Sequence, residues 1–139
     1  MSGQLFIPGT PIPQGSTKAF MPKGGRFPVV TSDNPKTKPW RADVAGHVRG
    51  AIGPGIVYPD GPVSVGCVFV MPRRAAEPKR VTPPHTRKPD LDKLLRAVLD
   101  ALSGLVFTDD SQVNEFHRAG KRTAAIGEQP GLDLSWGRP

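Results

Sequence analysis

Proline and glycine are concentrated in two long stretches of this sequence, and that distribution limits where regular structure can form. The 139-residue chain contains 17 prolines and 16 glycines. Residues 9–38 and 72–89 are rich in proline and show no sustained apolar period. Proline removes a backbone donor and fixes φ, so such stretches favour loops. We expect one domain over residues 1–139, with two extended loops around a compact centre.

Two segments outside these loops predict helices, each with one apolar face. Apolar residues recur every four positions over about 39–52, and Gly53 followed by Pro54 ends this pattern. A second helix is expected to begin after Asp90 as its N-cap and to end at Gly104. Its apolar stripe consists of Leu91, Leu94, Leu95, Val98 and Leu102.

Four segments predict strands. Residues 62–71 alternate between apolar and other positions, which predicts a half-buried strand with Cys67 pointing inward. Further strands are expected at 4–7, 112–122 and 131–136. The fold class that follows is α+β: a small mixed β-sheet with two helices packed on it, in a two-layer sandwich.

The positive charge of the chain lies in the two loops. The net charge is +7, yet residues 9–41 hold six cations against one acid, and residues 72–89 hold six against one. This segregation favours a polyanionic partner, nucleic acid before membrane, over a merely soluble basic protein. The loop cations that we expect to contact DNA are Lys18, Lys23, Arg26, Arg73, Arg74, Lys79, Arg80, Arg87 and Lys88.

Aromatic residues in the first loop allow two interpretations. Phe20 and Phe27 lie among its cations, and stacking on bases would suit a flexible arm that orders on nucleic acid. The favoured interpretation is that both rings are anchors into the core.

Other classes of protein are excluded. No apolar run approaches the roughly 20 residues of a membrane-spanning helix, and the N-terminal residues do not resemble a secretory signal. Cys67 is the only cysteine, which excludes an intramolecular disulfide and a cysteine-based zinc cluster. We expect a cytoplasmic protein with neither a membrane partner nor a small-molecule cofactor.

Acidic residues flank the second predicted helix. Asp90 and Asp92 stand at its start, and the pair Asp109-Asp110 follows the helix. Two carboxylates separated by one residue can converge on one hard cation, and a third can close the site if the chain folds back. Mg²⁺ prefers such oxygen ligands and usually keeps waters and substrate phosphates as well. With basic loops beside it, this cluster would suit metal-assisted phosphodiester hydrolysis.

Each acid also has a purely structural interpretation. Asp90 could cap the helix, and Asp92 could interact with the helix dipole. Asp92, Arg96 and Asp100 have the spacing of an exposed salt-bridge ladder. Asp109 and Asp110 could form a turn. Spacing alone leaves a shared metal site and these alternatives open.

The histidines are weaker candidates. Glu115 and His117 would share one side of a strand, which could bring them near a metal. A solvated or hydrogen-bonded strand histidine is the favoured interpretation of His117.

Residues 88–113, KPDLDKLLRAVLDALSGLVFTDDSQV, resemble the signature of the RusA-type Holliday junction resolvases. The similar features are a D-x-D that opens a helix, a following D-A-L, and a D-D-S-Q-V. The match is specific because spacing and neighbouring residues agree together. It extends more loosely into the next strand, where Glu115 stands at a position that is often acidic in the family.

The resemblance implies a RusA-like fold and specific residue roles. Asp90, Asp92 and Asp110 would bind a catalytic Mg²⁺, for which Mn²⁺ could substitute. Arg96 stands where the family has a catalytic lysine; it keeps the charge but does not donate a proton at ordinary pH. Lys93 stands where asparagine is common, and adds a DNA-binding cation beside the site.

The resemblance also implies a homodimer that cleaves four-way DNA junctions by paired nicks in recombination and repair. Two identical sites about one axis suit the near two-fold symmetry of such a junction. The compartment would be the bacterial cytoplasm, or that of the host for a phage-encoded protein. A nuclease that prefers flaps or forks, and a non-catalytic nucleic-acid-binding module, remain as alternatives.

Overall fold

Four strands form one mixed sheet in the computed structural model, which describes residues 2–15, 17–21, 23–32 and 34–139, with only the backbone for 17–20 and 29–32. The strands are β1 (Gly3–Pro8), β4 (Val63–Met71), β5 (Val113–Thr123) and β6 (Gly131–Gly137), in the order β1-β6-β4-β5. β4 and β5 are parallel, and the other neighbours are antiparallel.

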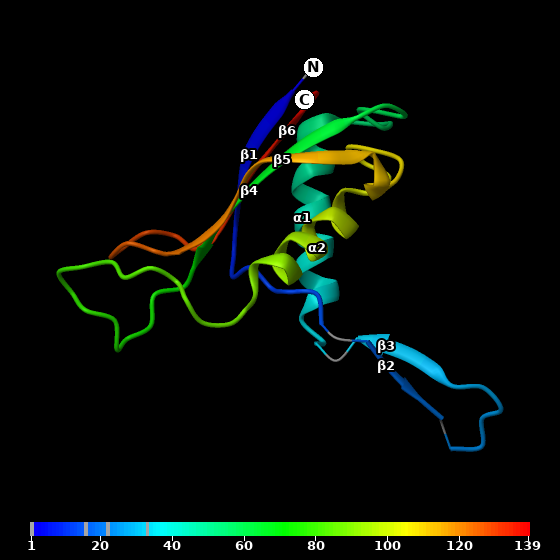
Figure 1. Ribbon diagram of the computed structural model, residues 1–139, viewed down its shortest axis with the longest axis horizontal. Coiled ribbons are helices and arrows are strands. Elements are labelled where there is room, and N and C mark those ends of the chain that lie inside the picture. Colours follow the sequence, from blue (N-terminus) through cyan, green and yellow to red (C-terminus); the bar gives the residue numbers. More distant parts are fainter. Residues whose placement is uncertain (1, 16, 22, 33) are drawn as a thin grey trace.

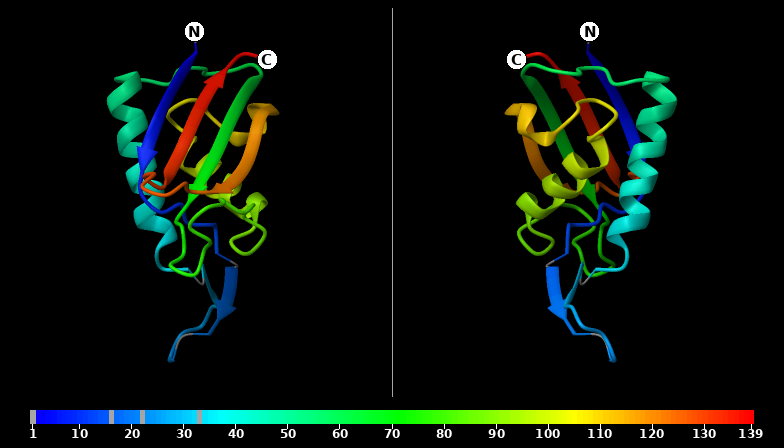
Figure 2. Two further views of the ribbon diagram at one scale, coloured as in Figure 1. Left: turned by 90° about the vertical axis from the view of Figure 1, so that its left-hand side faces the viewer. Right: turned by 90° about the vertical axis from the view of Figure 1, so that its right-hand side faces the viewer.

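The helices α1 (Thr37–Ile52) and α2 (Leu91–Leu102) cover one face of this sheet (Figures 1 and 2). The α+β fold with two helices on a mixed sheet is therefore confirmed. Within the described residues, no helix is long and apolar enough to cross a membrane.

The core lies between the sheet and the helices, with β4 at its centre. Cys67 and Phe69 of β4 and Leu94 and Val98 of α2 are fully buried. Cys67 points inward as predicted, and burial raises the pKa of its thiol to about 12, so the thiol stays protonated. The expectation of a half-buried strand is wrong, because β4 is buried on both faces. Val70, which is not part of the core between the sheet and the helices, is also buried. A strand in the middle of a sheet is covered on both faces when loops and neighbouring side chains close over the outer one.

β4, α2 and β5 form a β-α-β crossover, and this unit sets the direction of α2. Because β4 and β5 are parallel, the helix that joins them must run back along the sheet. The start of α2 lies near the end of β5, where Lys121 Nζ donates to Pro89 O at 2.9 Å. The residues that precede β5 lie near the start of β4, where Gln112 Nε2 donates to Tyr58 O at 3.1 Å.

The first proline-rich loop contains a hairpin that the sequence did not predict. β2 (Thr17–Phe20) and β3 (Val29–Ser32) pair antiparallel, and the ribbon projects away from the sheet (Figure 1). A ribbon without a core beneath it has no burial to impose an alternating pattern, so periodicity could not reveal it. Phe27 near its tip is 78% exposed, so the core-anchor interpretation is wrong for that ring. The side chain of Phe20 lies outside the described residues.

On the sheet face away from the helices, a histidine lies over the glycine of β4. His117 Nδ1 and Ser64 Oγ are 2.7 Å apart, and His117 Nε2 and Ser135 Oγ are also 2.7 Å apart. The prediction of a hydrogen-bonded strand histidine is confirmed. The ring passes directly over Gly66, where an added Cβ would come within 2.4 Å of His117 Nε2.

We predict that Gly66→Ala destabilises the fold by about 1–3 kcal/mol, because the new methyl group would displace the His117 ring and break its hydrogen bonds. Gly120→Ala on the adjacent strand is the matched control, since a Cβ there meets nothing within 4 Å. Urea unfolding of both variants measures the difference. Equal free energies of unfolding would show that the glycine is not required.

Candidate active site

The D-x-D motif, Asp90 and Asp92, lies at the N-terminus of α2. Asp90 occupies the N-cap position with extended backbone, but its side chain makes no capping hydrogen bond. Asp92 is in the first turn, and both residues are exposed. The interpretation of Asp90 as a simple cap is therefore wrong. Two carboxylates stand beside the N–H groups of the first helical turn, which have no acceptor within the helix, and such a location also attracts phosphate.

Lys121 of β5 holds the backbone that leads into this motif. Its Nζ donates to Arg87 O at 2.6 Å and to Pro89 O at 2.9 Å. A residue of β5 thus fixes the backbone at Arg87 and Pro89, and its positive charge lies next to the D-x-D motif. No local pattern could predict this role, because the contact spans more than 30 residues.

Asp109 and Asp110 have different positions in the structure. Asp109 caps the short 3₁₀ helix η1 (Asp110–Gln112): its carboxylate accepts from Ser111 N at 3.0 Å, and Gln112 Oε1 accepts from Asp109 N at 3.1 Å. The hydrogen bonds from Ser111 lower the pKa of Asp109. Asp110 is exposed in the first turn of η1. The turn interpretation is therefore confirmed for Asp109.

Asp110 and the D-x-D motif lie at opposite ends of the crossover, because the motif opens α2 and η1, which begins at Asp110, directly precedes β5. Lys121, beside the motif, is in register with Phe69 of β4, whereas Val113, three residues after Asp110, is in register with Val63. Six strand residues separate these positions, or about 20 Å at roughly 3.3 Å per residue. Across the described residues, no three His, Cys, Asp or Glu side chains gather closely enough to hold a metal ion. One chain does not fold back to join the three carboxylates, and their assignment as metal ligands stays a prediction.

Arg96 lies one turn beyond Asp92 on the exposed side of α2. The predicted salt-bridge ladder is absent from the described residues, because Asp100 pairs instead with Arg41 of α1, at 3.4 Å. The exposed Arg96 guanidinium is thus not held by the acids of its own helix. Lys93, on the same first turns, lines a pocket together with Asp90.

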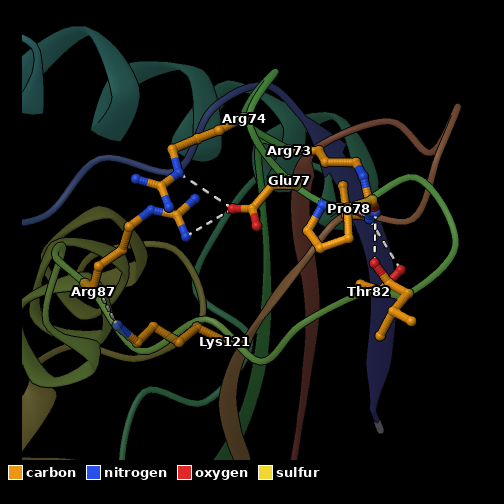
Figure 3. Close-up of polar contacts among 9 residues, drawn as sticks. Arg73, Arg74, Glu77, Pro78, Thr82, Arg87 and Lys121 are labelled. Atoms are coloured by element: carbon orange, nitrogen blue, oxygen red, sulfur yellow. Dashed lines mark hydrogen bonds and ion pairs between the residues drawn. The ribbon is translucent and has the colours of Figure 1, made fainter.

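Arg73 organises the second basic loop from within. Its guanidinium donates to Val81 O at 2.8 Å, to Thr82 Oγ1 at 3.0 Å and to Ala124 O at 3.1 Å. It also donates to Pro78 O (Figure 3). Because its guanidinium already donates to four protein acceptors, Arg73 stabilises the shape of the loop and is a weaker candidate for contact with DNA.

Glu77 ties the two ends of the same loop together. Its side chain is only 6% exposed and pairs with Arg74 Nε at 3.2 Å and with Arg87 Nη1 at 3.0 Å (Figure 3). These pairs bring the loop back toward the D-x-D motif. In this loop, Lys79, Arg80 and Lys88 are exposed and form no ion pair with the described residues.

The hairpin carries the cations predicted from the first loop. Lys23 and Arg26 are exposed near its tip, beside the exposed Phe27. Lys18 lies on β2, and its side chain is outside the described residues. Exposed cations and an exposed ring on a narrow ribbon make a surface that nucleic acid can accept.

A mixed sheet with two helices on one face, a carboxylate pair at a helix N-terminus and surrounding cations define a class of protein that acts on nucleic acid. The family model of endodeoxyribonuclease RusA matches residues 8–132, and the chain belongs to this family. It is an endodeoxyribonuclease of the Holliday junction resolvase class, which hydrolyses phosphodiester bonds. No curated protein sequence matches the chain.

We predict that the exposed cations Lys79 and Arg80 contribute to DNA binding, whereas Arg73, which is hydrogen-bonded to the protein, contributes to stability. Lys79→Gln with Arg80→Gln should weaken junction binding and reduce the slope of log affinity against log salt by about 0.9 per lost phosphate contact, with the melting temperature unchanged. Arg73→Gln should instead lower stability by about 0.5–1.5 kcal/mol for each hydrogen bond lost, because the carbonyl groups of the loop lose their donor. Salt titrations and thermal melts of both variants test this. A lower melting temperature for the double variant, or a lower salt slope for Arg73→Gln, would contradict it.

Proposed function

We propose that this resolvase cleaves four-way DNA junctions by Mg²⁺-dependent paired nicks, acting as a homodimer in the cytoplasm during recombination and repair. The observation that carries the proposal is the exposed D-x-D motif, whose carboxylates are not used to cap α2 and which stands among cations. Junction shape and phosphate geometry would select the substrate, because exposed loop cations carry little sequence information.

The donor chemistry of the motif fits a hard divalent cation. Asp90 and Asp92 offer carboxylate oxygens side by side, and Mg²⁺ in phosphoryl-transfer sites commonly takes one or two carboxylates together with substrate phosphate oxygens. When bound, the cation would supply Lewis-acid chemistry to the scissile phosphate and to the attacking water. Mn²⁺ has the same preference for oxygen ligands and is expected to substitute.

The chain's own groups would hold the DNA strand for this reaction. The N–H groups of the first turn of α2 attract a phosphate oxygen, and Lys88 and Lys93 flank that turn in the sequence and line the adjacent pocket. Arg96 would stabilise the negative charge that grows on the phosphate in the transition state. Lys121 would act as a positioning residue, since it holds the backbone before Asp90.

A homodimer would resolve the separation of Asp110 from the D-x-D motif. Asp110 is exposed about 20 Å away along the crossover, so it cannot join Asp90 and Asp92 within one chain. A two-fold axis relates each surface to its copy, and it can place Asp110 of one subunit beside the motif of the other. Each active site would then contain groups from both subunits.

We predict that Asp90→Asn, Asp92→Asn and Asp110→Asn each abolish cleavage while junction binding survives or tightens, because less negative charge faces the phosphates. Asp109→Asn is the matched control and should have a milder effect on cleavage, since Asp109 caps η1 and an Asn oxygen can still accept from Ser111 N. The assay uses four-way, three-way, flap and linear DNA, with and without Mg²⁺. Wild-type cleavage by Asp92→Asn would refute the site, and preferential cleavage of flaps would refute the junction assignment.

The same variants test the shared site when two inactive subunits are combined. Co-expressed Asp92→Asn and Asp110→Asn subunits should regain single-strand nicking, because one of the two sites in the heterodimer would have all three carboxylates. The combination of Asp90→Asn with Asp92→Asn should remain inactive, because both of its sites lack a carboxylate of the motif. No recovery in the first combination would place all three residues in one subunit's site or remove Asp110 from it.

We predict for Arg96 that Arg96→Lys keeps most activity and Arg96→Ala loses about 10²–10³-fold in single-turnover rate, the effect of about 2.7–4 kcal/mol of transition-state stabilisation. The melting temperature of Arg96→Ala should not change, because no ladder holds its side chain among the described residues. Arg41→Ala is the matched control: it breaks a real surface ion pair, with a cost of at most about 1 kcal/mol and no loss of rate. A destabilised Arg96→Ala that cleaves at wild-type rate would make Arg96 structural.

A further inference from the structure

A pocket of about 600 Å³ opens directly beside the D-x-D motif. Its walls come from the segment after β1 and from the second basic loop, and Met71 of β4 and Asp90 of α2 also line it. Ile12, Pro13 and Pro89 contribute apolar surface. The volume lies within the roughly 300–1,000 Å³ that small-ligand sites occupy, so the pocket is large enough for part of a substrate.

Two residues of this lining each carry a buried side-chain polar atom that has no hydrogen-bond partner among the described residues. These atoms are Gln14 Oε1 and His85 Nδ1, and His85 is only 7% exposed. A buried polar atom without a partner costs free energy, so such atoms in a native structure call for an explanation. A ligand that supplies hydrogen bonds to both atoms would remove that cost.

The surroundings of His85 keep its ring neutral. Burial lowers its pKa, and the Lys121 and Arg87 cations lower it further. A neutral imidazole can present either a donor or an acceptor at a given nitrogen, according to its partner. His85 can therefore read a polar edge without carrying a charge into the pocket.

We infer that this pocket receives one unstacked nucleobase of the DNA strand that is cut, with Gln14 and His85 as its hydrogen-bonding partners. A base is flat and apolar on its faces and polar at its edge, which matches the apolar side chains of Ile12, Pro13 and Pro89 beside the polar side chains of Gln14 and His85. Lys88 and Lys93 also line the pocket, and they can bind the phosphates on either side of that base. The inference rests on the proposed function, because the phosphate next to the base would lie at the D-x-D motif.

Branched DNA is a suitable source for such a base. Pulling a base out of the stack costs least where its pairing and stacking are already disturbed, as they are at a branch point. Enzymes that extrude a base read it by stacking on side chains and by hydrogen bonds to its edge. The pocket would therefore favour cleavage near the branch point and add a preference for the inserted base.

The experiment places 2-aminopurine, one position at a time, in the strand of a four-way junction around the branch point, in EDTA so that no cleavage occurs. This base becomes fluorescent when it leaves the stack, and the pocket lining contains no Phe, Tyr or Trp that would quench it. Wild-type protein should raise the fluorescence at one position beside the cut. Gln14→Leu and His85→Leu should each reduce that increase about fivefold, as expected for the loss of one net hydrogen bond.

Matched controls separate the pocket from general effects. Gln129→Leu and His47→Leu make the same replacements at exposed residues outside the pocket lining and should leave the fluorescence increase unchanged. His85→Asn should retain much of the increase, because its side-chain amide can stand in for Nδ1. Gln14 is only partly buried, so its variant should fold even if the His85 variants do not.

The outcomes distinguish this inference from the proposed function. A junction that is bound and, with Mg²⁺, cleaved, but that shows no fluorescence increase at any position, would overturn the base pocket and leave the resolvase assignment intact. An increase that persists in Gln14→Leu would also overturn it. Failure of the unmodified protein to bind or cleave any branched DNA would overturn both. Loss of base preference at the inserted position in Gln14→Leu, with cleavage retained, would support the pocket.

Discussion

The β-α-β crossover from β4 through α2 into β5 determines where most of the other elements of this structure lie. Two parallel neighbours require a connection that crosses the sheet, and α2 is that connection. Its apolar side, with Leu94 and Val98, closes the core over Phe69. Its N-terminus must then lie where β4 and β5 end, and the segment that enters β5 must lie at the other end. The positions of the D-x-D motif and of Asp110 both follow from this single connection.

The N-terminus of α2 combines features that oppose one another. Free N–H groups and nearby cations attract phosphate, whereas Asp90 and Asp92 repel it. A protein that only bound DNA would gain nothing from carboxylates at this place. The metal ion that we propose between the carboxylates and the phosphate would reverse that repulsion, and would account for both kinds of charge at one helix end.

The basic loops use their charge in two ways. Arg73, Arg74 and Arg87 are engaged with loop carbonyls or with Glu77, and they give the second loop a defined shape. Lys79, Arg80 and Lys88 remain exposed, and the hairpin presents Lys23 and Arg26 away from the body of the protein. Net charge alone therefore overstates the number of cations available to DNA, because a guanidinium with several protein acceptors is already satisfied.

The sequence by itself determined the secondary structure of the body and the residue types of the site. The apolar period of α2, the alternation in β4 and the D-x-D at a helix start are all features of local spacing, and for α2 burial of one face explains the period. The register of the sheet, the partner of Asp100, the hold of Lys121 on Pro89 and the distance from Asp110 to the motif depend on contacts between residues far apart in the chain. Local patterns carry no information on which strand becomes the parallel neighbour of β4. Only the tertiary structure decided that one chain supplies two carboxylates at one end of the crossover and the third at the other.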